Sequence, residues 1–169
     1  MVRCGGMHPY RSLVVMFHEE ALRIAVQTSG WSEGSYRNIW FVHNEHGPSS
    51  EYIPGTIERW QSFIEEAGLS RMVLVAGGYP PDKPSRDLAI NFLRRHETRI
   101  SDINVFIPRD GMWGATVRSV ATAIFMLSGI RTPVRFVRDE SELMEAIGRS
   151  GGTADEGRSV LAELALAAQ

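Results

Sequence analysis

The sequence predicts an α/β domain in which helices pack on a mixed, mainly parallel sheet of four to five strands. Three observations lead to this fold class. Short apolar runs typical of buried strands alternate with amphipathic helical patterns, and the connections between them are short. The chain also has 169 residues, of which 43% are hydrophobic and 22% charged, and this suits one globular domain.

The N-terminal part of the chain is expected to hold a leader and a β-hairpin. Residues 1–10 show no periodic pattern and are expected to form a flexible leader. Residues 13–17 are apolar, and Leu22, Ile24 and Val26 recur with the period of two that marks a half-buried strand. These two runs predict an N-terminal hairpin. The glycines and serines of residues 30–35 predict a loop.

The middle of the chain alternates between strand and helix patterns. Residues 38–43 form a continuous apolar run that suits a strand covered on both faces. The apolar positions that follow are Ile57, Trp60, Ile64 and Ala67. Their spacing of three and four predicts a helix, and Gly68 is placed to end it. Residues 71–76 predict the next buried strand.

The second half continues this alternation. Residues 85–96 predict a helix whose apolar side carries Leu88, Ala89, Phe92 and Leu93. The elements expected next are a strand at 103–107, a helix at 111–128 ending at Gly129, a strand at 133–137 and a helix at 139–147. Glycines after residue 148 predict a flexible joint before an alanine- and leucine-rich tail helix.

The expected order is therefore β-β-α-β-α-β-α-β-α plus a C-terminal tail helix. Alternating strands and helices with short connections imply parallel strands, and the N-terminal hairpin adds an antiparallel edge. The chain divides into a flexible leader at 1–10, a single α/β domain at 11–148, and a linker with the tail helix at 149–169.

The last third of this domain reads ISDINVFIPRDGMWGATVRSVATAIFMLSG, followed by RTPVRFVRDESELMEAIG. This succession of a strand, a long helix rich in small and apolar residues, a Pro-Val-Arg-Phe strand and a short acidic helix resembles STAS-like proteins. These are bacterial relatives of the anti-anti-sigma-factor fold. The resemblance covers residues 13–148 and implies a STAS-like sheet and a role in protein–protein regulation.

The same resemblance implies a switch residue that this chain lacks. In the anti-anti-sigma members, a kinase partner phosphorylates a serine in an Asp-Ser-Ser-Gly-like turn after the central strand. The corresponding turn here reads GGYPP at residues 77–81, and the nearest serine is Ser85, at the start of the next helix. We therefore expect a module without phosphorylation-controlled partner switching.

Charge and cysteine content exclude several classes of protein. The net charge of −2 gives no basic footprint for nucleic acid. The single cysteine, Cys4, cannot form an internal disulfide. The apolar runs at 13–17 and 120–127 are too short for a signal peptide core or a membrane span. We expect a cytoplasmic protein without a membrane span, a nucleic-acid partner or a cofactor.

The candidate metal ligands are His43, Glu45 and His46. On a strand, His43 and Glu45 point to one face and His46 to the other, and no third ligand has suitable spacing. We therefore interpret them as histidines at a sheet end and expect no metal. Neither Gly-x-Ser-x-Gly nor His-Glu-x-x-His occurs, so the sequence predicts no enzymatic activity and no catalytic residue.

Two glycine-containing turns are candidate ligand or partner sites. Gly77 and Gly78, beside Tyr79, form either a backbone anion cradle or, as we favour, a tight turn with positive φ. The second candidate is the helix start at residue 111, where Arg109 adds positive charge. Trp113 either joins this site or packs on the sheet.

Two charged clusters allow a similar choice. They are the basic Arg94, Arg95, His96 and Arg99 and the acidic Asp139, Glu140 and Glu142. We favour ordinary helix-end electrostatics over docking of a charged partner.

The helix at 111–128 carries the strongest functional prediction. Its second half is apolar nearly all round, so the tail helix, a second subunit or an apolar pocket must account for its outer side. The expected interface residues are Ile124, Phe125, Met126, Leu161 and Leu164. The sequence thus favours a non-enzymatic, STAS-like interaction module that forms a homodimer or binds a protein partner. A binder of a small lipophilic or anionic ligand is the first alternative, and an enzyme of unrecognised type is the less favoured second.

Overall fold

The computed structural model describes residues 14–15, 22–45, 51–77, 81–108 and 111–167. It confirms the α/β class with a mixed sheet. The sheet has seven strands in the order of the sequence, which exceeds the expected four to five. They are β1 (Val14–Val15), β2 (Leu22–Thr28), β3 (Trp31–Tyr36), β4 (Ile39–Asn44), β5 (Ser70–Ala76), β6 (Ile100–Phe106) and β7 (Val134–Val137).

The direction of the strands changes at β4. Strands β1 to β4 pair antiparallel, and β4 to β7 pair parallel. The predicted N-terminal hairpin is confirmed by the pairs Val14–Arg23 and Val15–Leu22. Four strands precede the first helix where the expected order has two, so the parallel part begins after an antiparallel meander.

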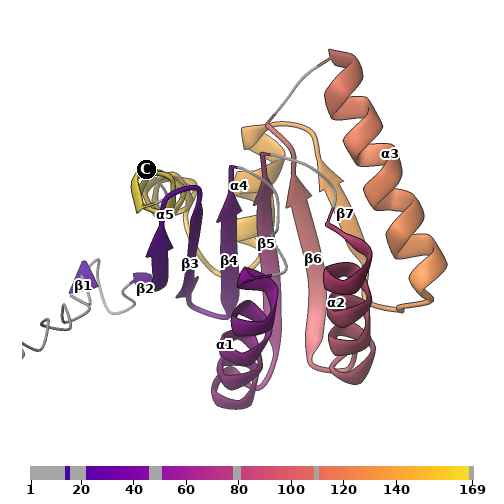
Figure 1. Ribbon diagram of the computed structural model, residues 1–169. Helices are drawn as coiled ribbons and strands as arrows, with labels where there is room; N and C mark the ends of the chain where they lie inside the picture. The colour runs from indigo at the N-terminus through magenta and orange to yellow at the C-terminus, as the bar shows by residue number, and fades with distance from the viewer. Residues whose placement is uncertain (1–13, 16–21, 46–50, 78–80, 109–110, 168–169) are drawn as a thin grey trace, which may run out of the picture.

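Within the described residues, five helices cover both faces of the sheet (Figure 1). One face carries α1 (Tyr52–Ala67), α2 (Lys83–Arg95) and α3 (Gly111–Ser128), and the other carries α4 (Glu140–Gly148) and α5 (Ala154–Ala167). The first three helices are the crossovers between successive parallel strands. Because such crossovers are right-handed and the strands are added in one direction, these helices lie on the same face.

Strand alternation divides the core between these faces. On β4, Trp40 and Val42 join the cluster beneath α1 to α3, while Ile39 and Phe41 join the cluster beneath α4 and α5. Both sides of this central strand are buried, and its four apolar residues are each at most 3% exposed. The continuous apolar run in the sequence has this cause.

Several helix boundaries follow the sequence closely. Helix α1 ends before Gly68, which has φ 78° and donates its N–H to Ile64 O. Helix α3 spans the predicted residues and is followed by Gly129 with φ 67°. Helix α2 begins earlier than expected, because Asp82 caps it by accepting the N–H of Ser85 at 2.9 Å.

Two expectations about the chain's ends and loops are wrong. Residues 30–35, which the sequence predicts as a loop, include most of strand β3. The hairpin between β2 and β3 turns at Gly30, which has φ 77°. The tail helix α5 does not cover α3. It packs on the opposite face, where Val160 and Leu164 are buried together with residues of α4 and β2. The tail therefore contributes to the core of the domain.

Candidate ligand-binding cavity

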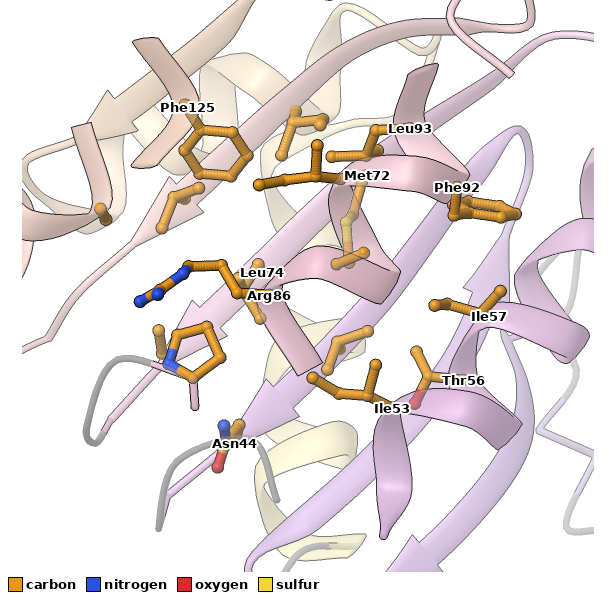
Figure 2. A pocket seen from close by; sticks show the side chains of 18 of the residues that line it. Asn44, Ile53, Thr56, Ile57, Met72, Leu74, Arg86, Phe92, Leu93 and Phe125 are labelled. Carbon is orange, nitrogen blue, oxygen red and sulfur yellow. The ribbon is translucent and has the colours of Figure 1, made fainter. Parts of the chain in front are cut away.

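An apolar cavity of about 190 Å³ lies between the sheet and helices α1, α2 and α3 (Figure 2). Its floor comes from β3 to β6 and its walls from the three helices. The lining residues are Trp31, Val42, Asn44, Ile53, Thr56, Ile57, Trp60, Met72, Leu74, Ala76, Pro81, Arg86, Ala89, Ile90, Phe92, Leu93, Ile103, Val105, Ile107, Val117, Ala121 and Phe125. Almost all of this lining is apolar, so the cavity suits a nonpolar group.

The floor follows from alternation along the parallel strands. Met72 and Leu74 on β5 point to this face, whereas Val73 between them is buried against the α4–α5 side. On β6, Ile103 and Val105 point the same way. Strands β5 and β6 thus supply three and two apolar side chains to one surface, and the helices must cover it.

The α1 wall is fixed by a buried ion pair. Glu33 on β3 is fully buried and accepts hydrogen bonds from Arg59 Nη2 at 2.8 Å and from Arg59 Nε at 3.1 Å. Trp31 Nε1 donates to the same carboxylate at 2.6 Å, and Thr56 Oγ1 donates at 2.5 Å. A buried carboxylate needs such saturation by donors. The network locks two residues of the lining, Trp31 and Thr56, in place.

Aromatic contacts hold the rest of the wall. Trp31 stacks on Tyr52 with ring centroids 5.3 Å apart, and Trp60 packs against Phe92 with centroids 5.1 Å apart. The second contact joins α1 to α2. Phe125 of α3 meets Phe136 of β7 edge-on at 6.3 Å, so it faces the sheet.

Three lining residues are polar. Thr56 is committed to Glu33, and Asn44, at the carboxyl end of β4, is 2% exposed. Arg86 is the one charged residue in the described lining. It stands on α2 and is half-buried, and Figure 2 shows its guanidinium directed away from the α1 wall that carries Ile53 and Thr56.

Of the predicted ligand-site residues, only Gly77 lies wholly among the described residues. Gly78, Tyr79 and Arg109 lie outside them, and only the backbone of Trp113 is described. Gly77 does not have the positive φ expected of it. Instead its N–H donates to Asn44 O at 2.6 Å, and an added Cβ would stand 3.0 Å from that oxygen. Glycine there permits close approach of β4 and β5.

The predicted interface residues divide between different places. Phe125 lines the cavity, and Met126 beside it is 78% exposed. Leu161 and Leu164 belong to the core on the opposite face, where Leu164 is 1% exposed. Leu164 is therefore unavailable to a partner. Ile124 is described in its backbone only.

The candidate metal ligands do not form a described cluster. No group of three His, Cys, Asp or Glu side chains able to hold a metal occurs among the described residues, and His46 lies outside them. His43 is half-buried, and its Nδ1 has no hydrogen-bond partner in the part of the chain that the structure describes. Burial lowers the pKa of His43, and the carboxylate of Glu45 opposes this shift.

The charged clusters act at helix ends, as favoured from the sequence. The guanidinium of Arg94 donates to Ser128 O, the last residue of α3, from Nε at 2.8 Å and from Nη2. Asp139 caps α4 by accepting the N–H of Glu142 at 2.9 Å, and Glu142 accepts the N–H of Arg138. These contacts satisfy helix termini, which is a structural role.

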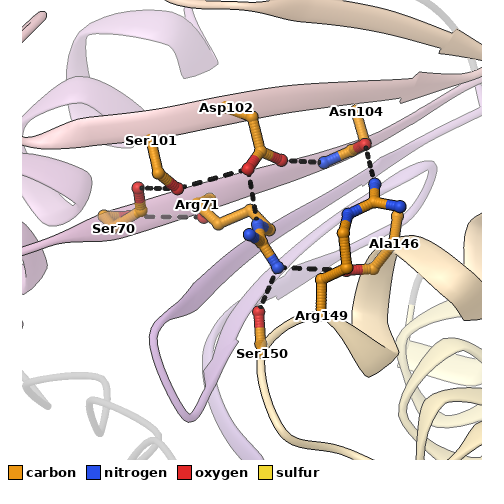
Figure 3. Close-up of polar contacts among 8 residues, drawn as sticks. All are labelled: Ser70, Arg71, Ser101, Asp102, Asn104, Ala146, Arg149 and Ser150. Carbon is orange, nitrogen blue, oxygen red and sulfur yellow. Dashed lines mark hydrogen bonds and ion pairs between the residues drawn. The ribbon is translucent and has the colours of Figure 1, made fainter.

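On the opposite face, a polar network ties β5 and β6 to the end of α4 (Figure 3). Arg71 Nε donates to Asp102 Oδ2 at 2.8 Å, and Arg71 Nη1 donates to Ser150 Oγ at 2.7 Å and to Ala146 O at 3.2 Å. Asp102 also accepts the amide of Asn104. Arg149 Nη2 in turn donates to Asn104 Oδ1 at 3.3 Å. Because the carboxylate of Asp102 is paired with Arg71, the network serves to hold the end of α4.

Arg86, Asn44 and Glu33 are the residues that sequence reasoning missed. A signal for Arg86 exists, because it precedes Ala89, Ile90 and Leu93 by three, four and seven positions and so lies on the apolar stripe of α2. An arginine on such a stripe indicates a cavity or a partner. Leu88, which was expected on this stripe, is 40% exposed.

No family model, curated protein or solved structure matches the chain. Among the helices described, none has the length and apolar character needed to cross a membrane. Functional inference therefore starts from the cavity and its lining.

Proposed function

We propose that the protein binds a small lipophilic ligand in the cavity between the sheet and helices α1 to α3. The apolar lining carries this proposal. A fully packed core leaves few voids larger than a water molecule, and this space is several times larger. Its walls are also held by the Glu33 network and the aromatic contacts, so the cavity is formed before a ligand arrives.

The volume sets the size of the ligand. An apolar cavity of about 150 Å³ is known to take benzene and to stay free of water. The space here, about 190 Å³, therefore suits a single ring or an alkyl chain of about six to eight carbons. Burying each methylene of such a chain contributes about 0.8 kcal/mol. The proposed activity is binding without chemical conversion.

Filling the cavity tests the proposal. Ala121 lines it from α3, and Ala115 lies on the exposed side of the same helix. We expect 1-octanol to bind the full chain in a calorimetric titration with a negative heat-capacity change. Ala121→Leu is expected to weaken binding at least tenfold, because its side chain occupies the space, whereas Ala115→Leu leaves the affinity unchanged. Absence of binding to the unsubstituted chain would contradict the proposal.

A second candidate is the interaction module predicted from the sequence, a STAS-like regulator acting as a homodimer. The outer face of α3 favours it. Met112 and Met126, which are 88% and 78% exposed, stand near the two ends of this helix on one side. Among the side chains that the structure describes between them, the exposed ones are small, namely Ala115, Thr116, Ser119 and Ala123. Such a stripe lets a second copy of the helix approach closely.

Sedimentation measurements test this second candidate. Met126→Glu places a charge on the α3 stripe and is expected to shift a dimer to monomer. Asn91→Glu, on the exposed side of α2, is the matched control and should leave the mass unchanged. A monomer at every concentration of the unsubstituted chain would overturn the homodimer and leave the cavity proposal untouched.

A further inference from the structure

Resting on the proposed binding function, we infer that the ligand is a lipophilic anion, with its charged head at Arg86 and its short apolar tail in the cavity. Two observations support this proposal: Arg86 lines the cavity, and its guanidinium has no hydrogen-bond or ion-pair partner among the described residues. An arginine stem can line apolar surface while its head reaches the polar boundary. Arg86, which is half-buried, marks that boundary.

The guanidinium of Arg86 differs from those of the other partly buried arginines. Arg59 is bound by Glu33 and Arg71 by Asp102. The backbone N–H of Arg86 donates to Asp82 O at 3.0 Å within α2, but its guanidinium makes no hydrogen bond or ion pair with any residue in the part of the chain that the structure describes. Five donors beside an apolar cavity therefore stand ready for an acceptor.

The carboxylate of Asp82 interacts electrostatically with Arg86, but it already serves as the N-cap of α2. Its carboxylate accepts the N–H of Ser85 at 2.9 Å and caps α2. Arg86 contributes only the last of the effects that lower the pKa of Asp82, after its hydrogen bonds to Ser85. The side chain of Asp82 is exposed and does not line the cavity. It therefore leaves the guanidinium available.

The surroundings of Arg86 add to its preference for an anion. It lies in the opening turns of α2, where the helix dipole is positive. The described lining contains no carboxylate, so nothing there attracts a cationic head group. The cavity also lies near the carboxyl ends of β4 and β5, marked by Asn44 and Ala76, where ligands of α/β sheets usually bind.

The predicted ligand is a monocarboxylate with about six to eight carbons or another single anion on a tail of that size. Its carboxylate would accept two hydrogen bonds from the Arg86 fork, as arginine geometry favours. Each methylene added to the tail should tighten binding about fourfold until the cavity is full. A ligand with a cationic head and a tail of the same length should bind more weakly than one with a neutral head.

Paired titrations of the full chain test the inference. Octanoate, 1-octanol and octylammonium share one tail and differ in the charge of the head. We expect octanoate to bind about tenfold more tightly than 1-octanol, because a charge-assisted pair at a half-exposed site contributes that much. Arg86→Gln should remove this preference, so that octanoate and 1-octanol bind with equal affinity, and Arg86→Lys should retain part of the preference.

The control is Arg95→Gln, which removes an exposed charge from the same helix away from the cavity, and it should keep the preference for octanoate. Equal binding of octanoate and 1-octanol, or an octanoate preference that survives Arg86→Gln, would overturn the head-group inference while the cavity still binds tails. If neither compound binds, both the inference and the proposed function are wrong.

Discussion

The two faces of the sheet are packed by different means. The α4–α5 face combines fully buried side chains such as Leu143 and Ile147 with the network of Arg71 and Asp102. The α1–α3 face buries large aromatic residues but leaves a cavity beneath its helices. Its polar network at Glu33 lies beneath α1, at one side of that space.

Under the proposed function, one face of the sheet chiefly stabilises the domain and the other binds the ligand. Hydrogen bonds from Arg71 of β5 to Ala146 O and Ser150 Oγ fix the end of α4. Helix α3, in contrast, meets its neighbours through Phe125, Val117 and the contact of Arg94 with Ser128. Val117, Ala121 and Phe125 of this helix line a ligand-sized space. Substitutions on the two faces should therefore have unequal effects.

The largest effect is expected for Asp102→Ala on the α4–α5 face. Asp102 is 6% exposed and pairs with Arg71, so the substitution leaves a buried guanidinium without its partner. Loss of one member of a buried ion pair costs about 3–5 kcal/mol of unfolding free energy. Urea denaturation measures this difference directly.

The exposed pair of Lys83 and Asp87 provides the control for that measurement. Asp87→Ala also removes an aspartate from an ion pair, but both partners face water. We expect a change within about 0.5 kcal/mol. Equal losses for the two variants would show that the network on the α4–α5 face does not stabilise the fold.

A smaller difference in unfolding free energy is expected between the variants Leu143→Ala and Leu93→Ala. Leu143 is fully buried in α4, and removing its side chain should cost about 3–5 kcal/mol. Leu93 already borders the cavity and lacks packing partners on that side, so its removal should cost at least about 1 kcal/mol less. Leu93→Ala should also enlarge the cavity and favour longer tails. Equal losses, measured by urea denaturation, would argue against an open cavity.

The regular part of the fold could be predicted from local pattern. The run at Ile39 to Val42 indicated a strand buried on both faces, and the spacing of Trp60 and Ile64 indicated a helix. Strand β3 could not be found in this way. Its buried residues include Glu33, which accepts from Arg59, and Ser32, whose hydroxyl donates to Leu164 O, 132 residues away in the sequence.

The glycine in that strand has an equally distant cause. A Cβ at Gly34 would stand 2.8 Å from Arg23 O, so the residue permits close approach of β2. In the sequence, Gly34 has Ser32 and Ser35 close to it, and such a run is typical of a loop. Residues that are buried through tertiary partners lack the periodicity on which sequence reasoning depends.

The candidate site was foreseen only in part. The sequence predicts Phe125 as an interface residue on a helix for which an apolar pocket is one of three alternatives, and in the structure it lines the cavity. The space itself depends on how α3 lies relative to α2, which no local pattern determines. Arg86 could have been noticed on the apolar stripe of α2, but its lack of a partner is a property of the folded chain.

The smallest effect concerns His43 and the pH dependence of stability. Burial lowers the pKa of His43 from its ordinary value of 6.5. Between the lowered pKa and 6.5 the unfolded chain therefore binds more protons than the folded one, and the free energy of unfolding rises with pH in this window. The contribution is fully present above 6.5 and is lost as the pH falls through the folded pKa.

Replacing His43 by leucine should make this pH dependence shallower. The substitution removes the titrating group and also a buried Nδ1 without a partner, so stability near pH 7 should be unchanged or slightly higher. The pKa of His96 is also lowered, by burial and by Arg95 and Arg99. His96 should therefore still make the free energy of unfolding of the variant rise with pH. Urea denaturation of both proteins across the window measures the change, and an identical slope would show that His43 titrates alike in the folded and unfolded states.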